Sequence, residues 1–474
     1  MRQYTQFYID GAWVSSESRS ELAVTNPANR QVVGHIAMGT VADVDLAVDA
    51  ARRAFSAYSM SSVKERLELL QRILHIYTQR YNEIAVAISE EMGAPITIAQ
   101  EDQARTGLAH LEANIQILQS YAFEERDGST LIRREPIGVC ALITPWNWPI
   151  NQVVCKVLPA LATGCSVILK PSEIAPFSSY IFAEILHQAG VPAGVFNLVN
   201  GDGPTVGAAM SSHPRVDMVS FTGSTRAGIE IAKAAANTVK RVSQELGGKS
   251  ANIILDSANL EQAVTEGTLS CFFNTGQSCD APTRMLVPAD DHDEAVAIAK
   301  RAADSVIVGD PADPQTTIGP VVSQLQYDRI QELIAQAIDE GTELVYGGTG
   351  SPNGLERGYF VKPTIFANVD NSSTIAQQEV FGPVLSIIPY NNVEHAIQIA
   401  NESLYGLCGY VWGEQLSALN VAKRVRTGMM LLNGNEGDYH APFGGYKQSG
   451  NGREWGKYGF EEFLETKAVM GINE

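Results

Sequence analysis

The chain has 474 residues, of which 45% are hydrophobic and 18% are charged. A chain of this length and mixture is expected to fold into two or three globular domains. Its formal net charge is −19. This charge argues against nucleic acid and anionic membranes as partners, because both bind clustered Lys and Arg.

The ends and the cysteines of the chain indicate a cellular compartment. The first ten residues lack the apolar core of a secretory signal, and no apolar run approaches the ~20 residues that span a bilayer. Six cysteines are present without a CxxC pair or a Cys/His cluster. We therefore expect reduced thiols in the cytoplasm, with neither a disulfide framework nor a bound metal.

The first long element in the chain is helical. In residues 41–91 the apolar side chains Leu67, Leu70, Ile73, Leu74 and Tyr77 recur at three- and four-residue spacing. This spacing is typical of a helix with one buried face.

Strand-like and helical segments then alternate, which predicts an α/β fold with largely parallel sheets. The second series of such segments begins after Gly247-Gly248, where we place a domain boundary. The predicted strands are 138–144, 166–170, 196–199, 218–222, 251–255 and 283–287, and a helix is predicted over 260–273.

Residues 121–136 and the last twenty or so residues fit neither series. The first segment is charged and has an Asp127-Gly128 turn signal at its centre, which predicts a hairpin. Because an isolated two-stranded ribbon is only marginally stable, we expect it to pair with a second subunit.

Two segments after predicted strands could bind phosphate. Residues 199–207 contain G-x-G-x-x-x-G, one residue longer than the dinucleotide fingerprint, and a simple glycine turn explains them equally well. At 221–228, Ser224 and Thr225 are good N-cap residues, and a helix start of this kind can also bind a pyrophosphate.

A third segment, Lys170-Pro171-Ser172-Glu173, follows a strand as well. Its carboxylate could accept hydrogen bonds from ribose hydroxyls, to which its ammonium could donate. Taken alone, a solvated Lys/Glu pair is the better interpretation.

Cys279 is the candidate nucleophile. Most cysteines are small buried hydrophobes, and the contexts of the other five suit that role. Cys279 instead lies on a polar loop after a predicted helix, where a thiolate could attack a carbonyl carbon. Structural burial remains the alternative on spacing alone.

Two further residues suit the same chemistry. The amide of Asn147, between two tryptophans and two prolines, could stabilise an oxyanion in a water-poor pocket. Glu245 ends a helix-like stretch at the predicted domain boundary, where a carboxylate could activate water, although a lone Glu is usually a solvated surface group.

Seven motifs in order resemble those of the aldehyde dehydrogenase superfamily, from near residue 5 to the C-terminus. They are TPWNWP at 144–149, KPSE at 170–173, FTGST at 221–225, ELGGK at 245–249, GQSC at 276–279, EVFGP at 379–383 and PFGGYKQSGNGRE at 442–454.

The resemblance implies NAD-dependent oxidation of an aldehyde to a carboxylic acid through a thiohemiacetal and a thioester. Cys279 matches the nucleophile, Asn147 the oxyanion donor and Glu245 the base for the hydrolytic water. Lys156 and Glu454 match positions that help to pass protons to solvent.

The resemblance also implies where the cofactor binds, with NAD favoured over NADP because Glu173 would repel a 2′-phosphate. Lys170 and Glu173 match the residues at the adenosine ribose, whereas Glu379 and Phe381 match those at the nicotinamide. The full set of implied cofactor residues is Thr144, Trp146, Lys170, Ser172, Glu173, Gly203, Gly207, Phe221, Thr222, Gly223, Ser224, Leu246, Gly247, Glu379 and Phe381. Asp217, which a simple fingerprint search would choose as the ribose acid, is rejected.

For the aldehyde tunnel, the matching positions are Trp148, Asn151, Gln152, Cys155, Ser278, Asp280 and Phe443. The small Cys155 and the polar Asn151 predict a roomy tunnel that can hydrogen-bond. A charged Asp280 beside the nucleophile would favour neutral bulky or basic aldehydes and semialdehydes over short carboxy-aldehydes. The alternative is that Asp280 turns away and pairs with Arg284.

The family fold has two Rossmann-like α/β domains and a small β oligomerisation arm. By this resemblance, residues 1–120 and 137–247 form the NAD-binding domain, 248–448 the catalytic domain, and 121–136 with 455–474 the arm of a homodimer or homotetramer. The competing functions are a CoA-acylating or phosphorylating relative and a non-catalytic relative. The intact ELGGK segment favours hydrolysis.

Overall fold

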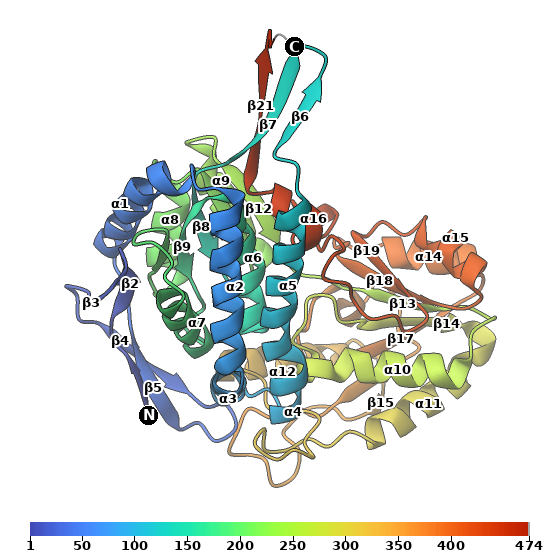
Figure 1. The fold of residues 1–474 in the computed structure, drawn as a ribbon. Helices are drawn as coiled ribbons and strands as arrows, with labels where there is room; N and C mark the ends of the chain where they lie inside the picture. Colours follow the sequence, from blue (N-terminus) through green and yellow to red (C-terminus); the bar gives the residue numbers. More distant parts are fainter. Residues whose placement is uncertain (473–474) are drawn as a thin grey trace.

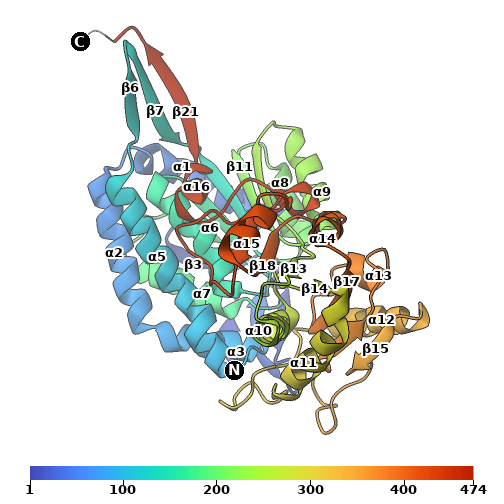
Figure 2. The same ribbon diagram turned by 90° about the vertical axis from the view of Figure 1, so that its right-hand side faces the viewer.

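The computed structural model describes residues 1–472 and contains two large sheets, each covered by helices on both faces, with a narrow arm that projects from the body (Figures 1 and 2). The α/β expectation is therefore confirmed. Residues 473 and 474, the end of the predicted arm, lie outside the described residues.

The first sheet has eight strands in the order β20-β12-β11-β8-β9-β10-β2-β3. Strands β8 to β12 run parallel, and β2, β3 and β20 join them antiparallel. The strands are β2 (Phe7–Ile9), β3 (Ala12–Val14), β8 (Val139–Ile143), β9 (Ser166–Lys170), β10 (Phe196–Leu198), β11 (Met218–Thr222), β12 (Arg241–Glu245) and β20 (Gly450–Asn451).

Alternate residues of this sheet enter two separate cores, as the two-residue period of a strand requires. In β8, Cys140 and Leu142 face one core, whereas Val139 and Ala141 face the other. The first core is closed by α2 (Val63–Gln79), α3 (Tyr81–Met92), α5 (Ala104–Ser120), α6 (Pro149–Thr163) and α7 (Phe177–Gln188). The second is closed by α1 (Val41–Tyr58), α8 (Ala208–Ser212) and α9 (Thr225–Ala236).

The second sheet has seven strands in the order β15-β16-β17-β14-β13-β18-β19, of which only β15 pairs antiparallel. They are β13 (Ala251–Ile254), β14 (Arg284–Pro288), β15 (Glu343–Tyr346), β16 (Thr364–Ala367), β17 (Val384–Tyr390), β18 (Cys408–Trp412) and β19 (Met429–Leu432). All of them lie within the segment predicted as the catalytic domain, while β20 returns the chain to the first sheet. The domain boundaries themselves stay a prediction.

Helices cover both faces of this sheet too. One core contains α10 and α11, and the other contains the longer α12 with α13, α14 and α15. Their bounds are α10 (Leu260–Phe272), α11 (His292–Asp304), α12 (Gln324–Asp339), α13 (Thr374–Gln377), α14 (Val393–Asn401) and α15 (Gln415–Ala422).

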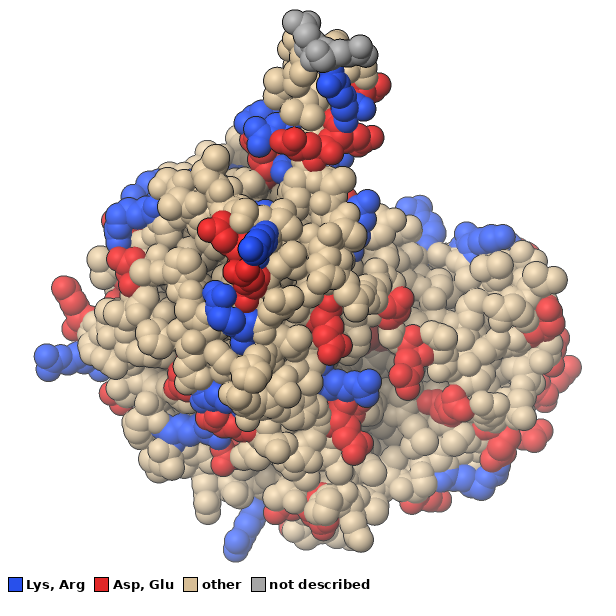
Figure 3. Space-filling view, viewed as in Figure 1, with Lys and Arg blue, Asp and Glu red and all other residues tan. Residues whose placement is uncertain are grey.

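The projecting arm is a three-stranded antiparallel sheet of β6 (Glu124–Asp127), β7 (Thr130–Pro136) and β21 (Leu464–Met470). Strand β7 is central, so β6 and β21 are both open edges. Acidic and basic side chains alternate on the arm in Figure 3. Arg133, for example, forms an ion pair with Glu124 on the neighbouring strand at 3.1 Å and another with Glu135 on its own strand at 3.5 Å.

The remaining elements are short. A small sheet of β1 (Arg2–Tyr4), β5 (Val32–Ala37) and β4 (Glu21–Thr25) lies near the N-terminus. The helices α4 (Ile96–Ile98) and α16 (Gly456–Glu461) precede α5 and β21, respectively.

The predicted strands and the helix at 260–273 agree with the structure to within one residue at each end. The helical region 41–91 is three helices instead of one. It is interrupted because Ser62 caps α2, accepting from the backbone N–H of Glu65 while the Glu65 carboxylate accepts from that of Ser62. Periodicity showed the buried face but not this capping box.

Candidate active site

A cavity of about 180 Å³ lies where the carboxyl ends of β8, β11 and β12 meet the loops of the second sheet. Most of its lining residues were predicted from the sequence: Trp146, Asn147, Thr222, Gly223, Ser224, Leu246, Gly247, Cys279, Glu379 and Phe381. Three others, Pro145, Gln326 and Arg329, complete it.

Gln326 and Arg329 belong to none of the motifs found in the sequence, and both lie on the amphipathic helix α12. Gln326 Nε2 donates to the backbone oxygens of Val380 (3.2 Å) and Phe381 (2.9 Å). Arg329 donates to the backbone oxygen of Glu379 at 3.2 Å. These bonds fasten the EVFGP loop to the helix, so α12 positions one wall of the cavity.

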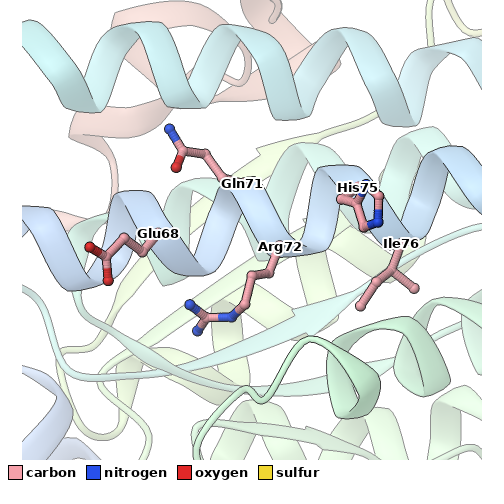
Figure 4. Close-up of a pocket in the computed structure, with 5 residues that line it drawn as sticks. All are labelled: Glu68, Gln71, Arg72, His75 and Ile76. Carbon is pink, nitrogen blue, oxygen red and sulfur yellow. The ribbon is translucent and has the colours of Figure 1, made fainter.

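A second hollow, of about 480 Å³, lies at the surface of the molecule and contains none of the predicted residues (Figure 4). Glu68, Gln71, Arg72, His75 and Ile76 line it, all from α2. We place the site at the smaller cavity because that is where the candidate nucleophile lies.

The loop that carries Cys279 has an unusual backbone. After α10 ends, Asn274 (φ 52°), Thr275 (φ 58°) and Gly276 (φ 71°) all adopt left-handed conformations. A Cβ on Gly276 would lie 2.1 Å from the carbonyl oxygen of Gly382, so no larger residue fits. Such a backbone persists only where surrounding contacts fix it.

Buried amides provide those contacts. Asn274 donates to the backbone oxygen of Asn147 at 3.0 Å and accepts from Gln103 at 2.9 Å. Gln277 Oε1 accepts from the backbone N–H of Val322 at 3.0 Å. The loop is therefore tied to elements of both sheets.

Cys279 is the one cysteine that is not fully buried, while the other five are buried as expected. Desolvation raises the pKa of its thiol well above the usual range, and Asp280, Glu379 and Glu245 raise it further. These surroundings favour the protonated thiol over the thiolate, so attack on a carbonyl carbon requires loss of the proton.

Asn147 and Trp148 hold the other side of this loop. Asn147 Nδ2 donates one hydrogen to the backbone oxygen of Gln277 at 3.0 Å. An amide nitrogen carries two hydrogens, so one remains for a group in the cavity. Trp148 Nε1 donates to Ser278 Oγ at 2.8 Å, so two of the predicted substrate residues are hydrogen-bonded to each other.

The expectation that Glu245 ends a helical stretch is wrong, because Arg241–Glu245 is strand β12, paired with β11. Glu245 is buried, and neither of its carboxylate oxygens has a hydrogen-bond partner among the described residues. Burial raises the pKa of this carboxyl well above its usual range, and the nearby Glu454 raises it further. A Cβ on Gly444 would lie 2.6 Å from Glu245 Oε1, so that glycine permits the close approach.

Lys156 and Glu454, predicted to move protons, form a buried ion pair. Lys156 also donates to Thr222 Oγ1 at 2.7 Å. The second carboxylate oxygen of Glu454 lies 3.3 Å from the sulfur of Cys155. The thiol of Cys155, predicted to line the tunnel, thus contacts the ion pair.

The predicted adenosine-ribose residues lie together at the ends of β8 and β9. Lys170 pairs with Glu173 at 3.2 Å, and Thr144 N–H donates to the backbone oxygen of Lys170 at 3.1 Å. Ser172 Oγ accepts from the N–H of Ile174. Gly207 is adjacent, because a Cβ placed on it would lie 3.9 Å from Lys170 Cδ.

Two helix starts face this region. Residues 203–207 form a π-helical turn that leads into α8, and Gly203 has nothing within 4 Å of a hypothetical Cβ. Ser224 caps α9, as predicted. The side chain of Phe221 packs against Gly223, where a Cβ would lie 2.5 Å from the Phe221 ring.

At the other end of the cavity, the carboxylate of Glu379 accepts from the N–H of Gly248 at 2.9 Å, and burial raises its pKa to about 7. A Cβ on Gly247 would lie 2.5 Å from Glu379 Oε2. Leu246 N–H donates to the backbone oxygen of Ser449. The ring of Phe381, at φ 59°, meets Trp146 edge-on with centroids 5.4 Å apart.

Two predicted tunnel residues contact an aromatic group that the sequence did not reveal. Asn151 Oδ1 lies 2.9 Å from Nε2 of the buried His110, and the Phe443 ring packs 4.6 Å from that of Trp455. His110 and Trp455 both contact Tyr439. These residues are far apart in the chain, so no local pattern could have joined them. Gln152, which follows Asn151 in the chain, is also buried. Its Oε1 has no hydrogen-bond partner among the described residues.

Asp280 does not pair with Arg284. The guanidinium donates instead to the backbone oxygens of Lys249 (3.0 Å), Ile399 (2.9 Å) and Ala400 (3.1 Å) and to Asn371. The pairing with Arg284, which the alternative interpretation named as an example, is therefore not found. Burial raises the pKa of its carboxyl, which weakens the charge that the sequence argument assumed.

Within residues 1–472, no cluster of three or more His, Cys, Asp or Glu side chains is arranged to hold a metal ion. No helix in that range is both long enough and apolar enough to cross a bilayer.

Comparison with known proteins agrees with this geometry. Residues 13–469 match the sequence profile described as the aldehyde dehydrogenase family. The chain is 58% identical over 473 residues to a 3-succinoylsemialdehyde-pyridine dehydrogenase from Pseudomonas sp, covering 99% of each chain.

Two solved structures are also similar. One is an aldehyde dehydrogenase C mutant from Pseudomonas syringae with NAD⁺ and octanal (TM-score 0.98, 50% identity, 99% and 97% covered). The other is an aldehyde dehydrogenase from Mycobacterium tuberculosis with NAD⁺ (TM-score 0.96, 38% identity, 99% and 98% covered). On this evidence of sequence, fold and site, the chain belongs to the aldehyde dehydrogenase family.

Proposed function

We propose that this protein oxidises an aldehyde to a carboxylic acid with NAD, using Cys279 as the covalent nucleophile. The observation that carries the proposal is the meeting of Cys279 and Asn147 in one cavity, with the unpartnered carboxyl of Glu245 close enough to raise the cysteine pKa. Nucleophile, oxyanion donor and base are the three groups that this chemistry needs.

In the first step the Cys279 sulfur forms a bond to the aldehyde carbon as its proton passes to solvent water, and the carbonyl electron pair moves to oxygen. The free N–H of Asn147 Nδ2 and the backbone N–H of Cys279 stabilise that oxyanion. A fixed donor of this kind contributes on the order of 2.7–4 kcal/mol to the rate.

The residues present fit a dinucleotide. Thr144 Oγ1 is buried without a partner near the Lys170 and Glu173 pair, and the start of α9 presents backbone N–H groups behind the Ser224 cap. When bound, NAD supplies the hydride acceptor. Lys170 and Glu173 would hold its adenosine ribose, and Glu379 and Phe381 its nicotinamide end.

Hydrolysis of the Cys279 thioester then needs a base for water. Glu245 has this role in our proposal, because its oxygens are unoccupied and its raised pKa makes it a stronger base than a surface carboxylate. Lys156 and Glu454 pass the proton onward. The two sheets would serve as the cofactor domain and the catalytic domain.

For the substrate we propose a neutral or bulky aldehyde or semialdehyde. The relative named for a pyridine semialdehyde and the neighbour holding octanal support this class. The aromatic side chains of Trp148, Phe443 and Trp455 around the predicted tunnel suit an apolar or aromatic chain.

The test is NADH formation with aliphatic and aromatic aldehydes, with and without phosphate or CoA. We expect a free acid product without either acceptor, and loss of turnover by several orders of magnitude in Cys279→Ala with NAD binding retained. A strict need for CoA or phosphate would instead identify an acyl-transferring relative. Absence of NADH with every aldehyde would point to a non-catalytic one.

We also propose a homodimer or homotetramer in the cytoplasm. Strands β6 and β21 are the two outer strands of the described arm, and an outer strand such as β21 can pair with a strand of a second copy. All six cysteines are free, as expected of a reducing compartment.

A further inference from the structure

Behind Glu245 lies a fully buried polar cluster made of Cys155, Lys156, Thr222 and Glu454. Each oxygen of the Glu454 carboxylate has one donor in it. Lys156 Nζ pairs with Oε1, and the Cys155 sulfur lies 3.3 Å from Oε2. The two donors are neighbours on α6, so a single helix turn contacts both oxygens of the Glu454 carboxylate. Glu454 lies 299 residues after Cys155 and 298 after Lys156 in the chain.

The thiol of Cys155 has a choice of two acceptors. The backbone oxygen of Gln152 lies 3.5 Å from its sulfur, farther than Glu454 Oε2, and it is uncharged. Hydrogen bonds to an ionised acceptor are the stronger kind, so the S–H points to Glu454. Burial and the neighbouring Glu454 raise the pKa of the thiol, so the proton stays on sulfur.

We propose that Cys155 is a positioning residue for the proton-transfer group, orienting the Glu454 carboxylate toward Lys156, and that it is not primarily a wall of the aldehyde tunnel. This inference rests on the proposed function of Glu245 and Glu454. It concerns the hydrolytic half of the reaction, since the cluster contacts neither the Cys279 sulfur nor the oxyanion donors.

The charged groups around Glu454 come from four places. Lys156 and the Cys155 thiol come from α6, and Glu245 comes from the end of β12. Arg453 directly precedes Glu454 in the chain, and Glu462 directly follows α16. Burial is the largest cause of the raised pKa values of Glu245 and Glu462, and the charge of Glu454 raises both further.

Removing the thiol takes away the donor that holds Glu454 Oε2, so the carboxylate should no longer be fixed toward Lys156. In Cys155→Ala we expect kcat to fall about five- to tenfold near pH 7 and the shape of its pH profile to change. The KM for aldehyde and the size of the NADH burst should not change. Cys155→Ser keeps a donor in the same place and should restore both kcat and the profile.

The experiment measures burst, kcat and KM from pH 5.5 to 9.5 for wild type, Cys155→Ala and Cys155→Ser. Cys140→Ala is the matched control, because that buried thiol in β8 lies near the carbonyl oxygen of Gly138 (3.9 Å) and the thiol of Cys165, and no contact with Glu454 or Lys156 is found for it among the described residues. If Cys155→Ala does not fold, Cys155→Val, which fills the space without a donor, takes its place.

Coincident pH profiles for wild type and the donor-free variant would overturn the inference. So would a serine variant that behaves like the alanine variant, or a change confined to KM, since a tunnel wall would act on KM and on aldehyde preference. A wild type that forms no NADH would contradict the proposed function itself, a result that can be told apart from any of these.

Discussion

At the scale of single residues, the site depends on carboxyls kept away from water. Among the described residues Glu245 has no hydrogen-bond donor, and its pKa is raised, whereas Glu379, which lines the cavity, accepts from the N–H of Gly248 and has a pKa of about 7. A carboxyl without donors is free to bind water, and one held by a backbone N–H is better suited to orient a ligand. Environment thus gives two identical side chains different roles.

Glu245→Gln should spare acylation and stall hydrolysis, because an amide keeps the shape but cannot take a proton. Rapid mixing should show one burst of NADH and then turnover slowed by about 10²–10⁴-fold. In wild type, the steady rate should rise with pH toward the alkaline range, since both Glu245 and Cys279 have raised pKa values and act only when deprotonated. Equal loss of burst and steady rate would argue against a role in deacylation.

Glu173 should control the choice between NAD and NADP. Its carboxylate, 3.2 Å from Lys170, would repel a 2′-phosphate by roughly 1–3 kcal/mol. We expect Glu173→Gln to reduce the preference for NAD about tenfold, measured as the ratio of kcat/KM values. Equal efficiency of wild type with both cofactors would contradict this role.

At the scale of elements, the loop after α10 combines a strained backbone with a nucleophile and an adjacent acid. Its three left-handed residues are fixed by buried amides, so Cys279 and Asp280 are both held in place. Tyr410 donates to the backbone oxygen of Asp280 at 3.1 Å, which adds to that restraint. Rigid elements of this kind set the geometry of a site to within fractions of an ångström.

Asp280 supplies the prediction that belongs to this loop. We expect wild type to prefer a neutral aldehyde to succinic semialdehyde of similar length, measured by kcat/KM, and Asp280→Asn to narrow the ratio severalfold. The effect should grow with pH, because the raised pKa leaves part of the Asp280 population uncharged in acid. A wild type that prefers the carboxylate, or a ratio unchanged in the variant, would refute the charge argument.

At the scale of the whole molecule, the arm stands clear of the body in both views (Figures 1 and 2). Strand β21 is exposed along most of its length, including Val469 at 37% and Met470 at 78%. An exposed strand with an open edge is a template for pairing with another chain.

We therefore expect oligomers in solution that depend on this arm. Removing residues 464–474 should shift the mass measured by light scattering toward the monomer, whereas the charge variant Lys467→Ala should retain the oligomer, because backbone pairing and not the Lys467 and Glu135 ion pair supplies most of the contact. An unchanged mass after truncation would place the interface elsewhere.

The order of residues along the chain was enough to predict the reaction class and several of the helices and strands of this protein. Alternating segments showed the α/β class, because strand and helix periods follow from backbone geometry that each segment carries alone. The motifs identified Asn147 and Glu245 as candidates, and Cys279 on the loop after a helix. Local order was sufficient for these conclusions.

Which side chains contact one another could be seen only in the folded structure. The contact of Cys155 with Glu454, the fastening of the EVFGP loop by α12, and the engagement of Arg284 by backbone oxygens all join residues separated by some 35 to 299 positions. Such contacts depend on how helices pack across sheets, where the direction of one buried bond is set by many neighbours at once. A linear pattern contains the residue types of this site, and packing determines which donor each acceptor receives.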